Sequence, residues 1–222
     1  HIQDPKISSK YFDFVLAPQH DPICGDNVIK TKFAINHITK SLLDDAASSY
    51  PNDFQSFKRP LILTVLGGKN SHFNFDLKSI SDMNKIIDKI CHSLQANAIM
   101  LFSRRTPLEI KKFCHSHFST NPLVTVWDEK QENPYLALLK HSDYVFLTCD
   151  SYSMISEALT AQKKTYVHLL PEKKRKSRLQ SFINHSIKQR FISPLCFPLL
   201  TNRKITISET DMAAKTLLAK LS

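Results

Sequence analysis

The chain has 222 residues, and 30 Lys and Arg against 20 Asp and Glu give it a net charge of +10. Apolar residues make up 42% and charged residues 23%, proportions that exclude collagen-like and disordered chains. Only 3 residues are glycine, which excludes phosphate-binding loops that need several glycines in series. At roughly 150 residues per domain the length corresponds to about one and a half domains, enough to bury a core without disulfides or metals.

Short β-rich segments alternate along the chain with segments of helical periodicity. The predicted strands, most of them continuous apolar runs typical of strands covered on both faces, are residues 12–16, 61–66, 98–102, 124–127, 144–148 and 165–169. The predicted helices are residues 79–93, a helix that opens at Thr106 and Pro107, and residues 134–141, 151–161, about 175–189 and 209–221. This alternation predicts an α/β fold, in which a Rossmann-like parallel sheet has right-handed connections and helices on both faces.

Residues 46–60 combine serine, proline, asparagine and aspartate without an apolar period, so we interpret them as a linker. Upstream, residues 1–45 hold one predicted strand, a polar loop and a short amphipathic stretch near 33–43, too little to form a core. We expect them to be the last strand and connecting segment of an incomplete N-terminal Rossmann-like domain. Residues 61–222 would then form a complete C-terminal one with basic C-terminal helices. The initial His1 in place of Met fits a processed chain or a piece of a longer one.

The positive charge is concentrated in the last third of the chain. Residues 1–150 carry 17 basic and 16 acidic side chains, and residues 151–222 carry 13 basic and 4 acidic ones. Such an excess marks either solvated surface or a face for an anionic partner. Aromatic residues do not interleave with it as nucleic-acid readers require, so we disfavour nucleic acid and expect an anionic membrane surface or a lipid-linked acceptor. The densest basic run consists of Lys173, Lys174, Arg175, Lys176 and Arg178.

Five widely scattered cysteines, with no CxxC pair among them, favour reduced thiols in a cytoplasmic protein. The longest apolar run is too short to span a bilayer, so any membrane association is expected to be peripheral, at the inner membrane. The cluster of Cys114, His115 and His117 has metal-binding residue types but no second group of ligands. We interpret it as a surface helix end, and no metal site is predicted.

Polar clusters follow four of the predicted strands. In an open parallel sheet ligands bind at the carboxyl ends of the strands, so these clusters are expected to meet at one rim. The pattern predicts a ligand site there, with phosphate as the group that arginines and helix N-termini bind. The rim residues are Gly67, Gly68, Lys69, Asn70, Ser103, Arg104, Arg105, Thr106, Asn133, Tyr135, Asp150, Ser151, Ser153, Met154 and Glu157.

Two of these clusters also have a purely structural explanation. Gly67 and Gly68 either let a ligand approach the backbone or form a plain turn. Arg104 and Arg105 are adjacent, and adjacent side chains do not easily point the same way. We therefore expect only one of them to grip a phosphate; the structural alternative is that one pairs with a nearby carboxylate and the other is solvated.

The helix predicted after the fifth strand begins with hydroxyl side chains. Ser151 and Ser153 lie in the first turn, where free backbone N–H groups can bind a phosphate. The alternative is an ordinary helix cap. Glu157, two turns in, reaches the same rim or is solvated. At the end of the first predicted strand, His20 beside Asp21 is a candidate general base, or the two form a hydrogen-bonded loop pair.

Seven segments, in this order, resemble the elongated-mitochondria (Elm-type) mitochondrial fission family, which occurs in plants and widely in bacteria. The resemblance extends from residue 4 to about residue 170, and the basic tail matches poorly. The matching segments are FDFVLAPQHD at 12–21, DNV at 26–28, AINHIT at 34–39, VLGG at 65–68, SRRT at 103–106, NPYLALLKHSD at 133–143 and LTCDSYSMISEA at 147–158.

The resemblance implies a GT-B-type glycosyltransferase fold, in which two Rossmann-like domains face each other across a cleft. This chain would be its C-terminal half with a fragment of the N-terminal half. The resemblance further implies that Gly67 and Gly68 approach the diphosphate of a nucleotide-diphosphate sugar. Ser151 and Ser153 would also meet phosphate, and Glu157 would bind the ribose hydroxyls.

GT-B enzymes usually take their catalytic base from the N-terminal domain and generally need no bound metal ion. The resemblance therefore leaves His20 and Asp21 as base candidates and implies no cofactor, with the nucleotide sugar as substrate. We expect a metal-independent, glycosyltransferase-like nucleotide-sugar-binding domain, completed in cis by the missing N-terminal domain. The alternative is a non-catalytic interaction or scaffold protein on the same fold, as in plant members that recruit a dynamin-related protein, or a fragment without activity.

Overall fold

The computed structural model describes residues 1–50, 54, 57–130, 132–173, 177–202 and 208–221. Its centre is a six-stranded sheet formed by β3 (Leu61–Leu66), β4 (Asn97–Phe102), β5 (Val124–Val126), β6 (Tyr144–Thr148), β7 (Lys164–His168) and β8 (Ile192–Pro194). The strands lie in the order β5-β4-β3-β6-β7-β8, and every neighbouring pair is parallel. The predicted α/β fold with a parallel sheet is confirmed.

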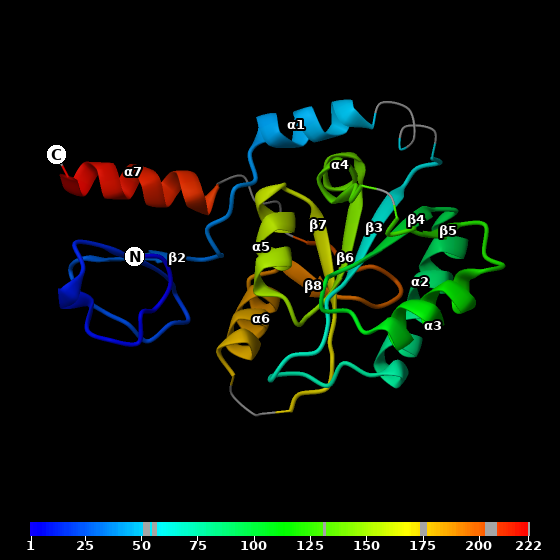
Figure 1. The fold of residues 1–222 in the computed structure, drawn as a ribbon, viewed down its shortest axis with the longest axis horizontal. Helices are drawn as coiled ribbons and strands as arrows, with labels where there is room; N and C mark the ends of the chain where they lie inside the picture. The colour runs from blue at the N-terminus through cyan, green and yellow to red at the C-terminus, as the bar shows by residue number, and fades with distance from the viewer. Residues whose placement is uncertain (51–53, 55–56, 131, 174–176, 203–207, 222) are drawn as a thin grey trace.

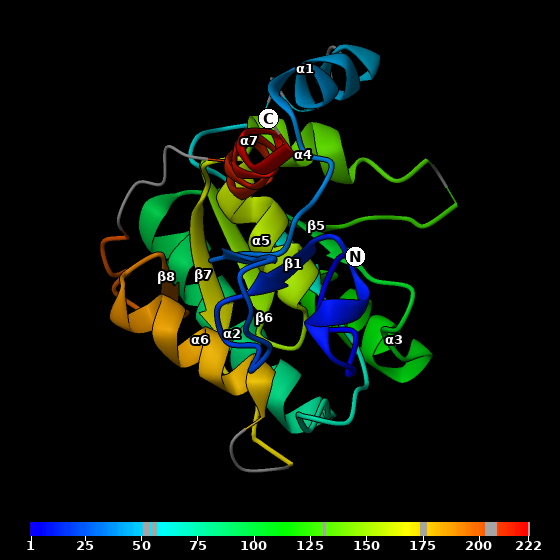
Figure 2. The same cartoon turned by 90° about the vertical axis from the view of Figure 1, so that its left-hand side faces the viewer.

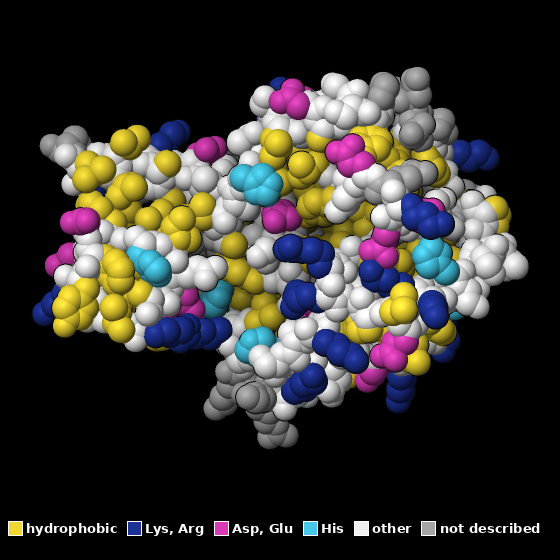
Figure 3. Space-filling model, in the orientation of Figure 1, with side chains coloured by type: hydrophobic (Ala, Val, Ile, Leu, Met, Phe, Trp, Pro, Cys, Tyr) yellow, Lys and Arg dark blue, Asp and Glu magenta, His cyan; other side chains and the backbone are white. Residues whose placement is uncertain are grey.

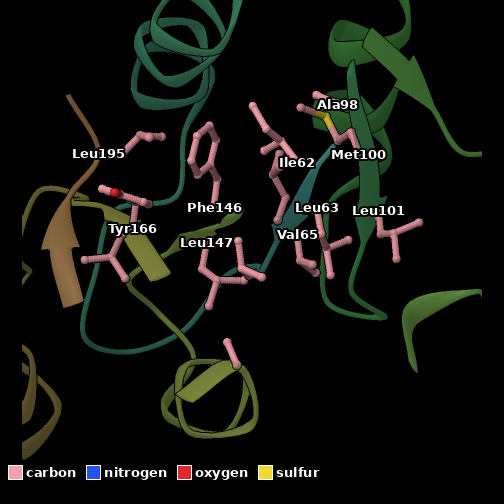
Figure 4. Packing of buried hydrophobic residues seen from close by; sticks show 14 of the residues in the cluster. Ile62, Leu63, Val65, Ala98, Met100, Leu101, Phe146, Leu147, Tyr166 and Leu195 are labelled. Atoms are coloured by element: carbon pink, nitrogen blue, oxygen red, sulfur yellow. The ribbon is translucent and has the colours of Figure 1, made fainter. Parts of the chain in front are cut away.

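Helices cover both faces of this sheet. They are α2 (Leu77–Leu94), α3 (Leu108–Phe118), α4 (Tyr135–His141), α5 (Tyr152–Thr160) and α6 (Arg178–Lys188). Figure 1 shows α2 and α3 against one face and α4, α5 and α6 against the other. Ile62 and Phe146 point to one side of the sheet, whereas Leu63 and Leu147 point to the other (Figure 4). Burial on both sides explains why these strands are continuous apolar runs.

Some element ends differ from the prediction. α2 begins two residues early, because the Asp76 carboxylate accepts a hydrogen bond from the Ser79 N–H at 2.8 Å and caps the helix. β8 was not predicted, since three residues that include Pro194 give no periodicity signal. Of the basic run, residues 174–176 lie outside the described part of the chain, and α6 begins at Arg178.

The first part of the chain contains a small sheet of its own. β1 (Val15–Pro18) pairs in parallel with β2 (Val28–Thr31), and α7 (Glu209–Leu221) lies beside β2. Figures 1 and 2 place residues 1–31, the N-terminal lobe, next to α5 and α6. β1 begins three residues later than the predicted strand. The prediction missed β2, because its four residues bury only Ile29 and Thr31 and follow no clear apolar alternation.

The predicted linker at 46–60 is wrong over its first four residues, which belong to α1 (Lys40–Ser49). Thr39 caps this helix by accepting a hydrogen bond from the Leu42 N–H at 3.1 Å, and α1 packs on α4. Packing against α4 stabilises a helix whose own apolar periodicity is weak. Phe54 is only 1% exposed and belongs to the core, whereas residues 51–53 and 55–56 lie outside the described part.

Arg178 joins the N-terminal lobe to the sheet. Its Nη1 donates to Asp4 Oδ2 and to Asp21 Oδ1, both at 3.1 Å. The two carboxylates are 8% and 9% exposed, so they have little water to replace the guanidinium. At the other end of the lobe, the Lys32 N–H donates to Glu209 Oε2 at 2.7 Å and ties residue 32 to α7.

Replacing Arg178 by alanine is therefore expected to loosen the lobe by about 2 kcal/mol, because the nearly buried Asp21 carboxylate loses its charged donor, while Asp4 keeps its ion pair with Lys6 at 2.8 Å. Amide hydrogen exchange measures this as faster exchange in Val15–Pro18, with that of β3 unchanged. Lys188→Ala, at the exposed end of the same helix, is the control and should change neither. Equal exchange rates in the two variants would mean that the Arg178 ion pairs do not hold the lobe in place.

Candidate functional site

The chain adds strands to the sheet in one direction from β3 (β4, then β5) and in the opposite direction from β6 (β7, then β8). The carboxyl ends of such a pair form the switch point at which open α/β sheets bind ligands. Here the Gly68 N–H donates to Asp150 Oδ2 at 2.9 Å, and the Gly67 N–H donates to Thr148 Oγ1 at 2.8 Å. Asn70 Nδ2 donates to the Asp150 carbonyl at 3.3 Å. The first and last predicted clusters therefore meet.

Asp150 is the buried charge of this switch point. Its side chain is fully buried, and within the described part of the chain its Oδ1 accepts no hydrogen bond. Burial raises the pKa of Asp150, although the Thr148 hydroxyl, the Gly68 N–H and the Arg105 guanidinium each lower it. A carboxyl with a raised pKa and one unsatisfied oxygen is typical of functional sites.

The raised pKa of Asp150 predicts a pH dependence of stability. The folded protein holds this proton to higher pH than the unfolded chain, so stability falls as the pH rises from about 4 through the folded pKa. Asp150→Asn has no such proton to lose. The difference in free energy of unfolding, variant minus wild type, should therefore rise between about pH 4 and the folded pKa of Asp150 and stay constant above it. Urea unfolding at a series of pH values measures the difference, and a difference that does not vary with pH would contradict the prediction.

Both glycines of the first cluster have a packing reason to be glycine. A Cβ on Gly67 would lie 2.2 Å from the Asp150 carboxylate, and a Cβ on Gly68 would lie 2.1 Å from the Arg105 carbonyl oxygen. Neither has a positive φ, unlike Gly25 at +151°. Close packing at the switch point, and not backbone conformation, thus accounts for the absence of a side chain at these positions.

The second cluster contributes one arginine to the switch point. Arg105 Nη2 lies 3.5 Å from Asp150 Oδ2, and its side chain is 48% exposed. Arg104 is exposed and has no hydrogen-bond or ion-pair partner in the described ranges. Ser103 and Thr106 fix the turn, because the Thr106 hydroxyl accepts from the Ser103 N–H at 3.0 Å and reaches the Leu66 carbonyl at 3.0 Å. Of the two arginines, Arg105 is the one that the fold aims at the rim.

Lys69 and Asn133 take part in local contacts. Lys69 Nζ lies 3.6 Å from Glu109 at the surface. Asn133 Oδ1 accepts from the Tyr135 N–H at 3.0 Å and so helps to start α4. The Tyr135 hydroxyl in turn donates to Glu157 Oε2 at 2.8 Å, and burial, together with Glu157, raises the pKa of Tyr135. The third cluster thus meets the fourth through this hydrogen bond.

α5 begins at the switch point with the expected cap. Ser151 Oγ accepts from the Met154 N–H at 3.4 Å, so the hydroxyl already satisfies one first-turn donor. Ser153 is exposed, and Met154 and Glu157 are half-buried. The remaining first-turn N–H groups have no partner in the helix itself and stay available to an anion.

His20 lies beside the start of α5. Its ring meets the Tyr152 ring edge-on at 5.2 Å and the Phe182 ring at 5.6 Å. Burial lowers the pKa of His20, and Lys30 lowers it further while Asp21 raises it. In the described part of the chain no hydrogen bond joins Asp21 to the His20 ring, because the Asp21 carboxylate accepts from Arg178 instead.

A hollow of about 340 Å³ opens next to His20, between the N-terminal lobe and α6. Its other lining residues include Lys32, Phe182 and His185. The two candidate base residues therefore have different surroundings: His20 faces an open hollow, and Asp21 is held in an ion pair.

Three residues near the rim escaped sequence reasoning. Tyr152 contacts His20, but its spacing in the sequence gave no signal for that role. Arg178 and Lys173 belong to the basic run, whose charge was the available signal. Lys173 Nζ donates to the Asn70 carbonyl at 2.9 Å, so the run begins at the rim loop after β3. Figure 3 shows Lys and Arg side chains gathered over the loops that follow β3 and β4.

Among the described residues, no three His, Cys, Asp or Glu side chains stand close enough to hold a metal ion. Cys114 is buried, and burial raises its pKa to about 11, while His117 Nε2 lies 2.7 Å from Asp88 Oδ2. The five cysteines are free thiols. In the same ranges of the chain, none of the helices has the length and apolar character needed to cross a bilayer.

The fold resembles solved structures of nucleotide-sugar enzymes. The UDP-GlcNAc 2-epimerase of Methanocaldococcus jannaschii matches with a TM-score of 0.53 at 12% identity, over 95% of this chain and 62% of that one. The Neisseria meningitidis UDP-GlcNAc 2-epimerase bound to UDP-GlcNAc matches with a TM-score of 0.52 at 13% identity, over 94% and 53%. Identities this low show the fold alone, and that fold is of the GT-B type.

Two curated relatives match at the level of sequence. The "Mitochondrial fission protein ELM1" of Arabidopsis thaliana is 28% identical over an alignment of 192 residues, which covers 75% of this chain and 44% of that protein. The uncharacterized protein RP120 of Rickettsia prowazekii is 29% identical over 155 residues, 69% of this chain and 43% of that protein. The chain thus spans less than half the length of these relatives. A sequence model described as "Mitochondrial fission ELM1" matches residues 1–221, and the chain belongs to that family.

Proposed function

We propose that the rim at β3, β4 and β6 binds the diphosphate and ribose of a nucleotide-diphosphate sugar, within a glycosyltransferase-like protein. One observation carries the proposal. The half-exposed Arg105, the tight Gly67 and Gly68 turn and the N-terminus of α5 converge on the switch point around Asp150. A guanidinium and a helix N-terminus are complementary to the oxygens of a diphosphate.

Each rim residue has a chemical task in this proposal. Arg105 leaves its 3.5 Å contact with Asp150 and grips the diphosphate, while the first-turn N–H groups at Ser153 approach the same oxygens. Glu157 accepts hydrogen bonds from the ribose hydroxyls, with the Tyr135 hydroxyl fixing its position. As the glycosyl bond breaks, Arg105 and Lys173 neutralise the leaving diphosphate, which requires no metal ion.

The proposed base is His20. Its lowered pKa keeps the ring neutral near pH 7, as a general base requires, and the hollow beside it has room for an acceptor hydroxyl. Asp21 contributes indirectly, because its ion pair with Arg178 fixes the loop that carries His20.

Surface character supports two further parts of the proposal. Ile2 and Ile7 of the N-terminal lobe and Leu218 and Leu221 of α7 are each 57–66% exposed, and Figure 3 shows the apolar side chains gathered there. We assign this surface to contact with an N-terminal domain in cis. The basic surface suits a cytoplasmic protein that lies peripherally on an anionic membrane and takes a lipid-linked acceptor.

Calorimetry with UDP-GlcNAc, GDP-mannose and CMP-sialic acid tests the proposal, and UDP-GlcNAc is the first probe because two structural neighbours are named as epimerases of it. Glu157→Gln should weaken binding about tenfold by removing a charged acceptor for the ribose. Glu109→Gln is the matched control, since Glu109 is 62% exposed and pairs only loosely with Lys69. If no nucleotide sugar binds at millimolar concentration, the proposal fails. The alternative of a scaffold protein then takes its place, in keeping with the name of the Arabidopsis relative.

A further inference from the structure

A second hollow, of about 500 Å³, lies at the opposite end of α5 from the switch point. It is bounded by α1, the end of α5 and the start of α7, and its lining includes Thr160 and Gln162. Because α5 has nine residues, about 13 Å of helix separates the two places. The hollow is within the range of about 300–1,000 Å³ that small-molecule sites occupy.

Among the described residues, three lysines line this hollow against a single acidic side chain, Asp211. Lys140 forms an ion pair with Asp44. Lys163 Nζ donates to the carbonyls of Lys140 and Ser142 at 2.6 and 2.8 Å. Burial, opposed by Asp143 and reinforced by Lys140 and Arg59, lowers the pKa of Lys163 to about 8. The third lysine is Lys40, which has no hydrogen bond or ion pair among the residues that the structure describes and interacts only at longer range with Asp44, whose pKa it lowers.

Two helices also begin at this hollow. α1 starts directly after Thr39, and α7 starts directly after Ser208, and both preceding residues line the hollow. The Thr39 and Ser208 hydroxyls each cap their helix, accepting from the Leu42 N–H at 3.1 Å and from the Asp211 N–H at 3.3 Å. Helix N-termini carry partial positive charge, which adds to that of the lysines.

The acidic side chain nearest in sequence to Asp211 does not cancel this charge. Glu209 is 3% exposed, and its Oε2 accepts from the Lys32 N–H at 2.7 Å. The hollow therefore combines an exposed lysine without a close partner among the described residues, a half-buried lysine with a lowered pKa and two helix N-termini. Nothing in the nucleotide-sugar proposal uses these groups.

We infer that this hollow is a second anion site, which takes a small molecule bearing a phosphate group. Lys40 and Lys163 supply the charge-assisted hydrogen bonds to its oxygens, and the hollow has room for the rest of the molecule. The ligand would touch the segment that ends at Lys40 and the segment that starts at Ser208. Residues 36–40 connect the N-terminal lobe to α1, and residues 208–211 form the start of α7, so the ligand would tie these two segments together.

Residues 36–40 and the start of α7 already contact each other, and Asn36 also contacts α5. The Asn36 N–H donates to Thr210 Oγ1 at 3.2 Å, and the Thr210 hydroxyl donates back to the Asn36 carbonyl at 3.0 Å. The Asn36 amide reaches Thr160 Oγ1 at 3.0 Å. A ligand bound here would thus act on α5, the helix whose other end forms the rim.

Calorimetry with inorganic phosphate tests the inference on the 222-residue chain carrying Arg105→Gln, which removes the arginine of the rim as a phosphate ligand. Binding should persist in this background, and Lys40→Gln should weaken it at least tenfold. Lys40 is exposed and has only a longer-range interaction with Asp44 to lose, so this variant is expected to fold. Lys163→Gln should weaken binding as well, and Lys188→Gln on α6 should leave it within twofold.

Two results would overturn the inference that the hollow binds an anion, and a third would overturn the choice of phosphate. One is the absence of phosphate binding at 10 mM in the Arg105→Gln background, and the other is binding that Lys40→Gln leaves unchanged. Citrate, run in parallel, separates phosphate from carboxylate chemistry, and citrate binding tighter than phosphate would refute the assignment to phosphate. The inference does not depend on the proposed function. Replacing Arg105 should weaken nucleotide-sugar binding at the rim, whereas replacing Lys40 should weaken phosphate binding in this hollow.

Discussion

Replacing Gly68 by alanine is expected to lower the free energy of unfolding by about 3 kcal/mol. The new Cβ would lie 2.1 Å from the Arg105 carbonyl oxygen, which is backbone and has no rotamer in which to move away. Relief requires the turns after β3 and β4 to separate, and overpacking of this kind typically costs about 1–3 kcal/mol or more. For a chain of this size the loss corresponds to a melting temperature lower by about 10 °C.

Gly67→Ala offers a sharper comparison, because its Cβ would meet the Asp150 side chain at 2.2 Å and not the backbone. Combining Gly67→Ala with Asp150→Ala should therefore destabilise less than the sum of the two single variants. Combining Gly68→Ala with Asp150→Ala should give no such relief. Lys69→Ala, at the next position and exposed, is the control and is expected to stay within about 0.5 kcal/mol of the wild type. Relief by Asp150→Ala in both pairs would contradict the described packing.

The sheet was predictable because its strands are buried on both faces. Runs such as residues 61–66 and 144–148 are apolar except for one threonine each, and their length of five or six residues between turn residues favours a buried strand over a helix. β2 and β8 were missed for the opposite reason, since they are short and gain their strand conformation from neighbours. α1 was missed in part because packing on α4, a tertiary contact, stabilises residues 46–49 as helix.

The position of the rim was predictable from strand order alone, but the partners of its residues were not. Nothing in the sequence tells that Asp150 would fill the space beside Gly67, or that Tyr135 would reach Glu157 across two helices. Nor does the sequence reveal that Asp21 turns to Arg178, some 157 residues later, and away from His20. The partner of each of these side chains is set by contacts between segments that are distant in the sequence.

Which of the two adjacent arginines lies at the rim is likewise decided by a contact between distant segments. Replacing that arginine is expected to have the largest effect on ligand binding. Arg105 lies 3.5 Å from Asp150 at the switch point, whereas Arg104 points to solvent with no partner in the described ranges. Arg105→Ala should weaken the binding of UDP-GlcNAc about 100-fold, because a bidentate, charge-assisted contact with the diphosphate is lost. Arg104→Ala removes the same charge one residue away and should change the affinity less than about threefold.

The pair also separates geometry from charge. Arg105→Lys keeps the positive charge but not the planar fork of donors, and we expect it to recover less than a tenth of the lost affinity. Calorimetry of the three variants at two salt concentrations gives the result, because a loss caused only by the general field shrinks as salt screens it, whereas the loss of a direct contact persists. Equal weakening by Arg104→Ala and Arg105→Ala would mean that the rim attracts its ligand by net charge, and the diphosphate would then have no defined place beside Asp150.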